Sequence, residues 1–171
     1  MATSLDPSEY HPYYASYVAL VKEAPLLEAL NNGLESITSV ITSIPEDKKT
    51  YSYASGKWSV AEVLVHLLDA ERIFQYRALR FSRNDTTELK GFEQDDYVPE
   101  SRANQRSLES ILEEFVAIRK ATITLFKSLN GECLRRSGMA NGASMSVRAL
   151  GYVICGHQAH HFRILQERYL T

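Results

Sequence analysis

Cysteine is scarce in this sequence, which has Cys133 and Cys155 among its 171 residues. Their spacing does not match the paired cysteines of a zinc site, and the first residues show no export signal. We therefore expect two free thiols in a cytoplasmic protein. The sequence has no apolar run long enough to predict a membrane span. The formal net charge of -2 provides no broad basic face, so we expect neither membrane nor nucleic acid as a partner.

Two-residue alternation of apolar and polar side chains is also missing, so we expect no strands. Hydrophobic residues make up 44% of the chain and charged residues 23%, which is typical of a globular protein. The length suits a single domain covering residues 1–171. Together these features predict an all-α fold, in which amphipathic helices form a bundle.

Four long stretches have helical periodicity. The first covers about residues 10–44 and is interrupted at Pro25. The second begins at Ser59, where Ser-Val-Ala-Glu forms a capping box. The third covers about residues 107–129, and Asn130-Gly131 is a plausible stop. The fourth begins at Ser146, a favourable N-cap, and continues almost to the end of the chain.

The connection over residues 84–106 is unusually long for a helical bundle. An extended segment of that length spans the whole bundle, so it allows the second and third helices to run parallel. Its acidic residues Glu93, Asp95 and Asp96 either fold over a site or face solvent. In the next connection, Asn141-Gly142 predicts a turn.

Histidines mark the candidate site. The fourth helix carries GHQAHH, in which His157 and His161 are four residues apart and share one helical face. That spacing lets two imidazoles bind one metal ion. His66 lies on the buried stripe of the second helix and can supply a third nitrogen. Three histidines with an open fourth position are typical of catalytic metal sites. His160 is the competing ligand, and the bland alternative is that all of these histidines are ordinary core residues.

The same segment resembles the HExxH motif of metalloproteases, with Gln158 in place of the glutamate. A glutamine amide takes up no proton at useful pH and cannot act as the general base. Protease chemistry of that type is therefore disfavoured, while metal binding by the histidine pair is unaffected.

Three segments together resemble the DinB/YfiT-like superfamily: GKWSVAEVLVHLLDAERIFQYRALRF, GFEQDDYV and NGASMSVRALGYVICGHQAHHFRIL. The resemblance implies a four-helix bundle with up-down-down-up topology and a long loop between helices two and three. It also implies a divalent metal, zinc or nickel, held by His66, His157 and His161. At Gln158 this chain departs from relatives that often carry glutamate.

The resemblance further implies a metal-dependent enzyme, either a hydrolase or a thiol S-transferase that uses a low-molecular-weight thiol, and a homodimer. A non-catalytic bundle that binds a metal or a small ligand is the alternative. Side chains that can line such a site are His160, Gln158, Asp69 and Arg148. Glu62 and Asp69 lie close to His66 in the sequence and either accept from an imidazole N–H or are simple surface charges. Arg148 either binds an anionic substrate group or pairs with a neighbouring acid.

Overall fold

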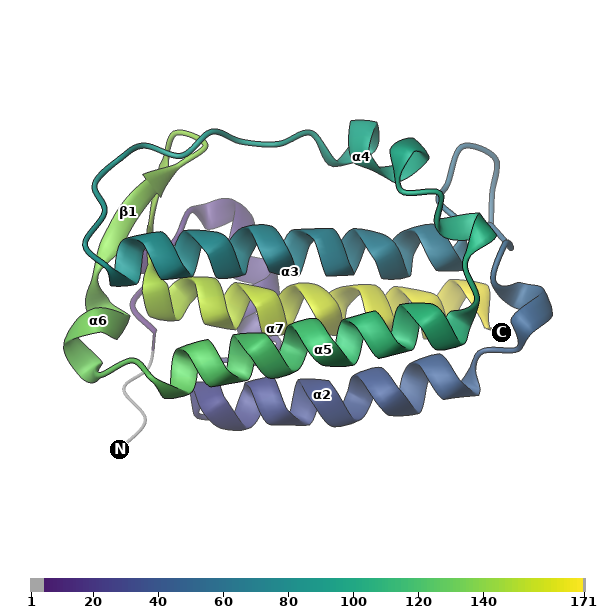
Figure 1. Ribbon diagram of the computed structural model, residues 1–171, viewed down its shortest axis with the longest axis horizontal. Helices are drawn as coiled ribbons and strands as arrows, with labels where there is room; N and C mark the ends of the chain where they lie inside the picture. Colours follow the sequence, from purple (N-terminus) through teal and green to yellow (C-terminus); the bar gives the residue numbers. More distant parts are fainter. Residues whose placement is uncertain (1–4, 171) are drawn as a thin grey trace.

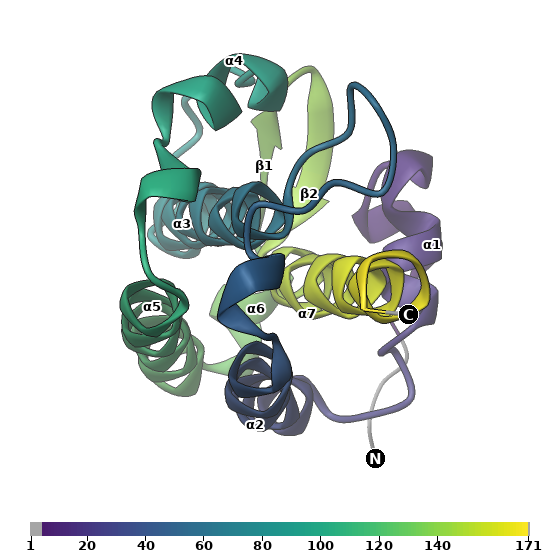
Figure 2. The same cartoon turned by 90° about the vertical axis from the view of Figure 1, so that its right-hand side faces the viewer.

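Four long helices lie side by side in the computed structural model, which describes residues 5–170 (Figures 1 and 2). Their amphipathic sequences bury apolar faces against one another, so the predicted all-α bundle is confirmed. The four are α2 (Leu26–Ser43), α3 (Val60–Ser82), α5 (Leu108–Lys127) and α7 (Val147–Ile164).

The helices are arranged in the up-down-down-up order. In Figure 1, α2 and α7 run from left to right, and α3 and α5 run from right to left. The connection between α3 and α5 travels along the length of the bundle and contains the short helix α4 (Gln94–Glu100). This long crossover makes α3 and α5 parallel and lays a segment of chain over α3.

Serine caps begin three of the long helices. The Ser59 hydroxyl accepts from the Glu62 amide at 3.2 Å, and the Glu62 carboxylate accepts from the Ser59 amide at 2.7 Å. Ser107 and Ser146 cap α5 and α7 in the same way, by accepting from an amide three residues later. These bonds satisfy first-turn amides that have no partner inside the helix. The predicted starts of α3 and α7 are therefore confirmed.

The N-terminal segment is less helical than predicted. The stretch expected to begin a helix at residue 10 contains one 3-10 turn, at Pro12–Tyr14, and the short helix α1 (Ala15–Ala19), and another 3-10 turn precedes it at Pro7–Glu9. Pro25 then caps α2. Near the other end, Asn130 caps a further short helix, α6 (Gly131–Arg135), and Leu165–Tyr169 continues α7 as a π-helical turn.

The expectation of no strands was wrong. Strands β1 (Ser137–Ala140) and β2 (Ala143–Ser146) form an antiparallel hairpin. Asn141 and Gly142 make the turn with φ of 51° and 71°, the left-handed conformation that favours these two residue types. Each strand has four residues, too few for a clear alternation. Leu89 of the long crossover pairs with Ala140, so the hairpin and the crossover are joined.

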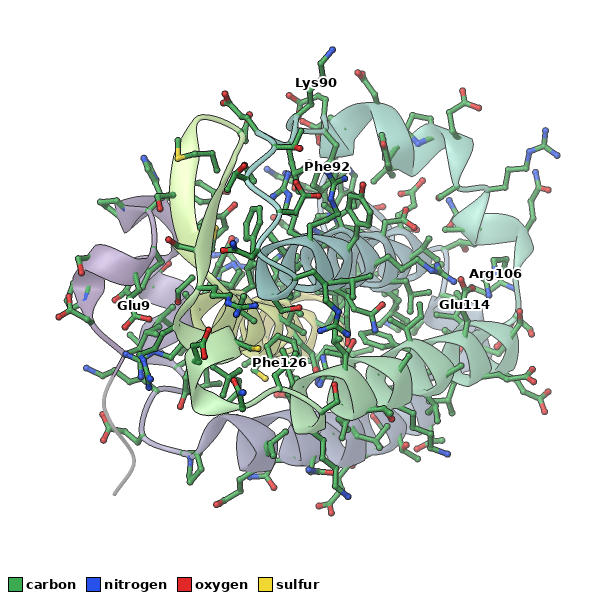
Figure 3. The ribbon with its side chains drawn as sticks, turned by 60° about the vertical axis from the view of Figure 1, so that its left-hand side comes forward. Glu9, Lys90, Phe92, Arg106, Glu114 and Phe126 are labelled. Carbon is green, nitrogen blue, oxygen red and sulfur yellow. The ribbon has the colours of Figure 1, made fainter. Side chains whose placement is uncertain are left out.

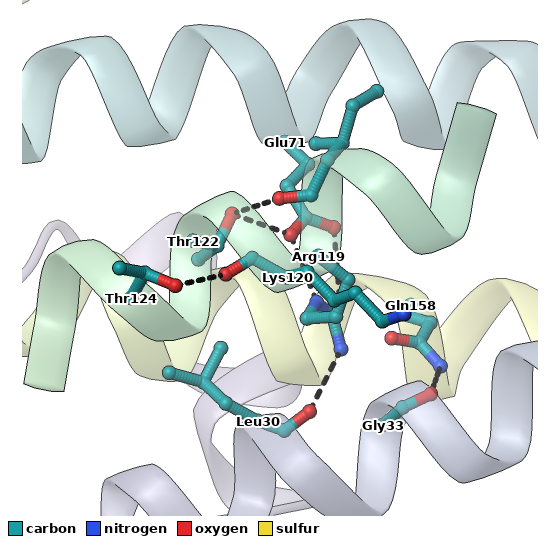
Figure 4. A network of polar contacts seen from close by, with 9 residues as sticks. Leu30, Gly33, Glu71, Arg119, Lys120, Thr122, Thr124 and Gln158 are labelled. Carbon is teal, nitrogen blue, oxygen red and sulfur yellow. Dashed lines mark hydrogen bonds and ion pairs between the residues drawn. The ribbon is translucent and has the colours of Figure 1, made fainter.

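A buried polar network crosses the centre of the bundle (Figure 4). The Glu71 carboxylate of α3 accepts from Arg119 Nε at 2.8 Å and Nη2 at 2.9 Å, and from the Thr122 hydroxyl at 2.7 Å. Arg119 also donates to the Leu30 carbonyl of α2. The network therefore joins α2, α3 and α5 through charge-assisted hydrogen bonds that keep both charges satisfied in the core.

Two further expectations have outcomes in the described range. Between residues 5 and 170, no helix combines the length and apolarity needed to cross a membrane. Cys133 and Cys155 are both free, and Cys155 is buried. Burial raises the pKa of the Cys155 thiol to about 12, so this thiol is not reactive at neutral pH. The expected lack of an export signal concerns in part residues 1–4, which lie outside the described residues.

Candidate metal centre

Three histidines from two helices meet at one point of the bundle. His66 is on α3, and His157 and His161 are one turn apart on α7. The Nε2 atom of His157 lies 3.1 Å from Nε2 of His66 and 3.1 Å from Nε2 of His161. One nitrogen from each residue lies within 4.8 Å of the other two. The structure thus brings together the three side chains that the sequence pattern singled out.

This arrangement fits a bound cation. A neutral imidazole has a single N–H, so His157 Nε2 can either donate one hydrogen bond or accept with one lone pair. It cannot satisfy both neighbouring nitrogens, whereas a metal ion accepts all three lone pairs. Tetrahedral coordination at the usual zinc–nitrogen length places ligand nitrogens about 3.3 Å apart, close to the 3.1 Å observed here.

Burial keeps the three rings neutral. His66 and His157 are buried, and His161 is partly buried. Desolvation lowers the pKa of His66 to about 4, although the Asp95 carboxylate opposes this change. Desolvation and the neighbouring histidines lower the pKa of His161 to about 3 and that of His157 well below its ordinary value. Neutral imidazole is the form that binds a metal.

Aromatic neighbours hold the rings in place. Trp58, which directly precedes the cap of α3, packs against His66 with ring centroids 4.8 Å apart. Tyr17 of α1 lies beside His157 at 5.4 Å and beside His160 at 5.1 Å. The α1 backbone can approach this closely because Gly156, next to His157, has no side chain. A Cβ on Gly156 would collide with the Tyr17 carbonyl group.

A cavity of about 510 Å³ opens onto the three histidines. Its walls come from the N-terminal segment around Tyr13–Tyr17, from α3, from the crossover at Phe92–Gln94, from the hairpin turn and from α7. The volume is within the usual range of about 300–1,000 Å³ for small-molecule sites. The histidines are therefore accessible to a ligand of modest size.

The crossover and the hairpin together form one wall of this cavity. Leu89 N donates to the Met139 carbonyl, and Asn141 N donates to the Leu89 carbonyl, both at 2.9 Å. In Figure 3, Lys90 projects away from the bundle, while the Phe92 ring lies closer to α3. Phe92 lines the cavity. The long connection that allows α3 and α5 to run parallel therefore also helps to enclose the cavity.

Two residues of α7 that were predicted to line the site, His160 and Gln158, contact other parts of the protein and do not line the cavity. His160 packs against Tyr17 and lies outside the group of converging nitrogens. Gln158 points toward α2, where its amide nitrogen donates to the Gly33 carbonyl at 2.9 Å (Figure 4). Its Oε1 atom is buried and has no hydrogen-bond partner among residues 5–170. Successive helix positions are about 100° apart, so Gln158 faces away from its neighbour His157.

Asp69 and Arg148 also lie elsewhere. Asp69 is close to Arg72, Glu114 and Arg106 on the α5 side of α3, and neither it nor Arg148 is among the described residues that line the cavity. The guanidinium of Arg148 pairs with Glu9. This contact matches the alternative that Arg148 pairs with a neighbouring acid.

The acidic crossover is split between two cavities. Glu93 lines the main cavity. Asp95 lines a neighbouring one of about 350 Å³ that also includes His161. Asp96 is exposed. Of the three acids, Asp95 is the one whose charge acts on His66.

Several cavity residues escaped the sequence analysis. Tyr17 and Tyr14 come from the N-terminal segment, and Phe74 and Arg77 follow His66 on α3. A signal was present for the last two, because Arg77, eleven residues after His66, returns to nearly the same helical face, and Phe74, eight residues after His66, continues the apolar stripe. For the tyrosines there was none, since their position depends on how α1 packs against α7.

Comparison with protein-family models identifies the relatives of this chain. Residues 29–165 match the model of the DinB superfamily, which covers most of the sequence. The chain belongs to the DinB superfamily. The matched range includes α3, α5 and α7, all of α2 except its first turn, and the three converging histidines. A search of curated proteins found none that matches.

Among solved structures, the fold of this DinB-superfamily chain is similar to that of YfiT from Bacillus subtilis. The TM-score is 0.76 at 13% sequence identity, and the match covers 85% of each chain. YfiT is described as a probable metal-dependent hydrolase with an unusual four-helix bundle topology. At this identity the likeness establishes the shared fold.

Proposed function

We propose that this protein is a metal-dependent enzyme that acts on a small molecule bound in the cavity beside His66, His157 and His161. The observation that supports it most strongly is the convergence of three neutral imidazole nitrogens at the wall of a cavity of about 510 Å³. The description of YfiT as a probable metal-dependent hydrolase supports the same reaction class. A divalent metal held there would act as a Lewis acid that favours deprotonation of water or a thiol at neutral pH.

The protein side chains have separate roles in this proposal. His66, His157 and His161 hold the metal, and Trp58 and Tyr17 orient their rings. Burial and the nearby Tyr13 raise the pKa of Tyr17 to about 12, so its hydroxyl stays protonated and can donate to substrate. Asp95 lines the neighbouring cavity that shares His161, and its charge acts on His66, so it is the candidate to accept a proton from the attacking nucleophile at the metal.

The finer assignments belong to the same proposal. Imidazole ligands suit zinc and nickel, and we propose one of these as the metal. The nucleophile is either water, which makes the protein a hydrolase, or a low-molecular-weight thiol, which makes it an S-transferase. We further propose a cytoplasmic homodimer whose subunit is one domain over residues 1–171, on the basis of the DinB resemblance and the reduced cysteines.

Metal analysis tests the site directly. Untagged protein purified without chelator should contain about one zinc or nickel ion per chain, and His157→Ala should contain none, because the central nitrogen is lost. His160→Ala is the matched control, since its ring lies on the same helix outside the converging group. Equal metal content in wild type and His157→Ala, or no metal after reconstitution, would contradict the proposal.

The nucleophile requires a second experiment. The metal-loaded protein is assayed with an activated ester in water and with a chloroaromatic electrophile plus a thiol. Metal-dependent release in the first assay indicates a hydrolase, and metal-dependent thioether formation in the second indicates an S-transferase. Bound metal without turnover in either assay would favour the alternative of a non-catalytic binding protein.

A further inference from the structure

Arg77 is a buried arginine whose charge has no carboxylate partner in the described residues. Two arginines there are buried, Arg119 at 0% exposure and Arg77 at 4%. Arg119 has the Glu71 carboxylate. Arg77 instead donates to the Lys90 carbonyl at 3.3 Å, and the Tyr14 hydroxyl lies beside its guanidinium. A buried cation without a counter-ion is costly, because neutral acceptors replace its hydration only in part.

Arg77 lines the same cavity as the three histidines. It is the one lysine or arginine among the described residues that do so. Its guanidinium carbon lies 5.8 Å from the centre of the Phe74 ring, and that ring lies 6.3 Å from the ring of His157. Along α3, Phe74 lies between His66 and Arg77, so the cavity wall runs from an imidazole end past Phe74 to a cationic end. Arginine side chains in helices lean toward the helix N-terminus, which here is the direction of His66.

The surrounding groups leave this end of the cavity suited to an anion. Tyr14 contributes a hydroxyl beside the guanidinium. Glu93, the acid that lines the cavity, is exposed, so water screens its charge. The Arg77 guanidinium has five N–H donors and a planar shape that binds carboxylate or phosphate in a bidentate manner. The neutral groups beside it, the Lys90 carbonyl and the Tyr14 hydroxyl, leave several of these N–H donors available for a ligand.

We propose that Arg77 binds an anionic group, a carboxylate or phosphate, at the end of the substrate farthest from the three histidines. The substrate is then a small molecule with its reactive group at the imidazole end, an apolar middle over Phe74 and a negative charge at Arg77. This substrate class rests on the proposed function, because the reactive group is assigned to the metal. The anion-binding role of Arg77 itself needs no metal.

Two matched ligand pairs separate these claims. Metal-free full-length protein is titrated with hexanoate and with neutral hexanamide, and backbone amide shifts are followed by NMR. Cobalt-loaded protein is titrated with mercaptohexanoate and mercaptohexanol, and the thiolate–cobalt absorption band is followed. In both pairs the carboxylate should bind about tenfold more tightly, as expected for a charged hydrogen-bonded contact. A length series of mercaptoalkanoates should show the preference once the chain passes Phe74.

Variants assign the preference to one side chain. Arg77→Gln should remove the tenfold preference and leave the affinity for hexanamide and mercaptohexanol unchanged, while Arg77→Lys should retain part of it. Arg83→Gln, at the exposed end of α3, is the control and should keep the full preference. Thermal unfolding of each variant confirms that it is folded before titration.

The outcomes are distinct. No carboxylate preference in the metal-free wild type, including no binding of either probe, would overturn the role of Arg77, as would an equal preference in a folded Arg77→Gln. A carboxylate preference without any cobalt–thiolate band would keep the role of Arg77 and count against the metal-centred function.

Discussion

Glu71 and Arg119 place opposite charges in the centre of the bundle, where water does not reach them. Their exposed fractions are 3% and 0%. Although burial opposes the charged form, the Glu71 carboxylate raises the pKa of Arg119 above its ordinary value. Each charge is tolerated because the other is present. The pair therefore contributes little net stability over an apolar pair, but the loss of one member leaves the other unpaired.

Substitution of one partner of this ion pair should destabilise the protein strongly. Glu71→Gln leaves Arg119 buried without a counter-ion and should lower the free energy of unfolding by about 3–5 kcal/mol. Urea unfolding followed by circular dichroism measures the change. The double variant Glu71→Leu/Arg119→Met should be far more stable than the two single losses predict when added together, because no charge remains unpaired.

The exposed ion pair of Arg72 and Glu114 serves as the control. Arg72 is 49% exposed, so solvent screens the pair, and Arg72→Gln should change stability by about 1 kcal/mol or less. If Glu71→Gln cost no more than Arg72→Gln, the buried network would not have the role described here.

Contacts between elements depend on where glycine occurs. The short helix α1 packs against α7 at Gly156, and this contact carries Tyr17 to the histidines. A glycine inside a helix normally lowers its stability by about 1 kcal/mol relative to alanine. Here the missing side chain provides the space for the Tyr17 backbone. Helix α1, which supplies part of one cavity wall, can therefore take this position only because Gly156 has no Cβ.

Gly156→Ala tests this packing. The added methyl group would meet the Tyr17 carbonyl, so we expect a loss of about 1–3 kcal/mol in unfolding free energy despite the better helix propensity. Gly131→Ala at the start of α6 is the control, because a Cβ there is in ordinary contact at 3.5 Å and should not destabilise the protein. A neutral or stabilising Gly156→Ala would show that α1 is free to shift.

At the scale of the whole molecule, the N-terminal segment is attached to the bundle by Glu9. Its carboxylate accepts from Arg148 Nε at 2.7 Å and from the Ser146 hydroxyl at 2.8 Å. Desolvation raises the pKa of Glu9, but these hydrogen bonds outweigh it, and the net pKa is lowered from 4.5. The same segment carries Tyr14 and Tyr17 into the cavity, so this contact helps to enclose the site.

Stability should therefore depend on pH through Glu9. The pKa of Glu9 is lower in the folded protein than in the unfolded chain. Its contribution to the free energy of unfolding is therefore complete above the pKa of the unfolded chain, and it disappears as the pH falls through the pKa of the folded protein. Glu9→Gln should lose about 1 kcal/mol at neutral pH, and its difference from wild type should shrink in acid. Urea unfolding at neutral pH and at about pH 3 measures both.

Glu23→Gln is the comparison for this experiment, because Glu23 is 90% exposed and makes a loose contact with Lys22 at 4.0 Å. Its effect should be small at both pH values. A Glu9→Gln difference that persisted unchanged in acid would mean that packing, rather than the charge of Glu9, secures the segment.

The helices and most of their starts could be predicted from the sequence because their signals are local. Periodicity and the Ser59 and Ser146 caps involve residues within four positions of each other, as does the spacing of His157 and His161. The hairpin was missed because four-residue strands have no measurable alternation, although its Asn141-Gly142 turn was recognised.

The tertiary structure alone decided how these parts meet. It brought His66 to the α7 histidines, turned Gln158 toward α2 and placed Arg77 at the cavity with no carboxylate partner in the part of the chain that the structure describes. Each of these results depends on the rotation and packing of helices that are distant in sequence. The sequence by itself determined the helical elements and the chemistry they carry, since both follow from neighbouring residues. Which of those side chains share a cavity was decided by the packing of the bundle.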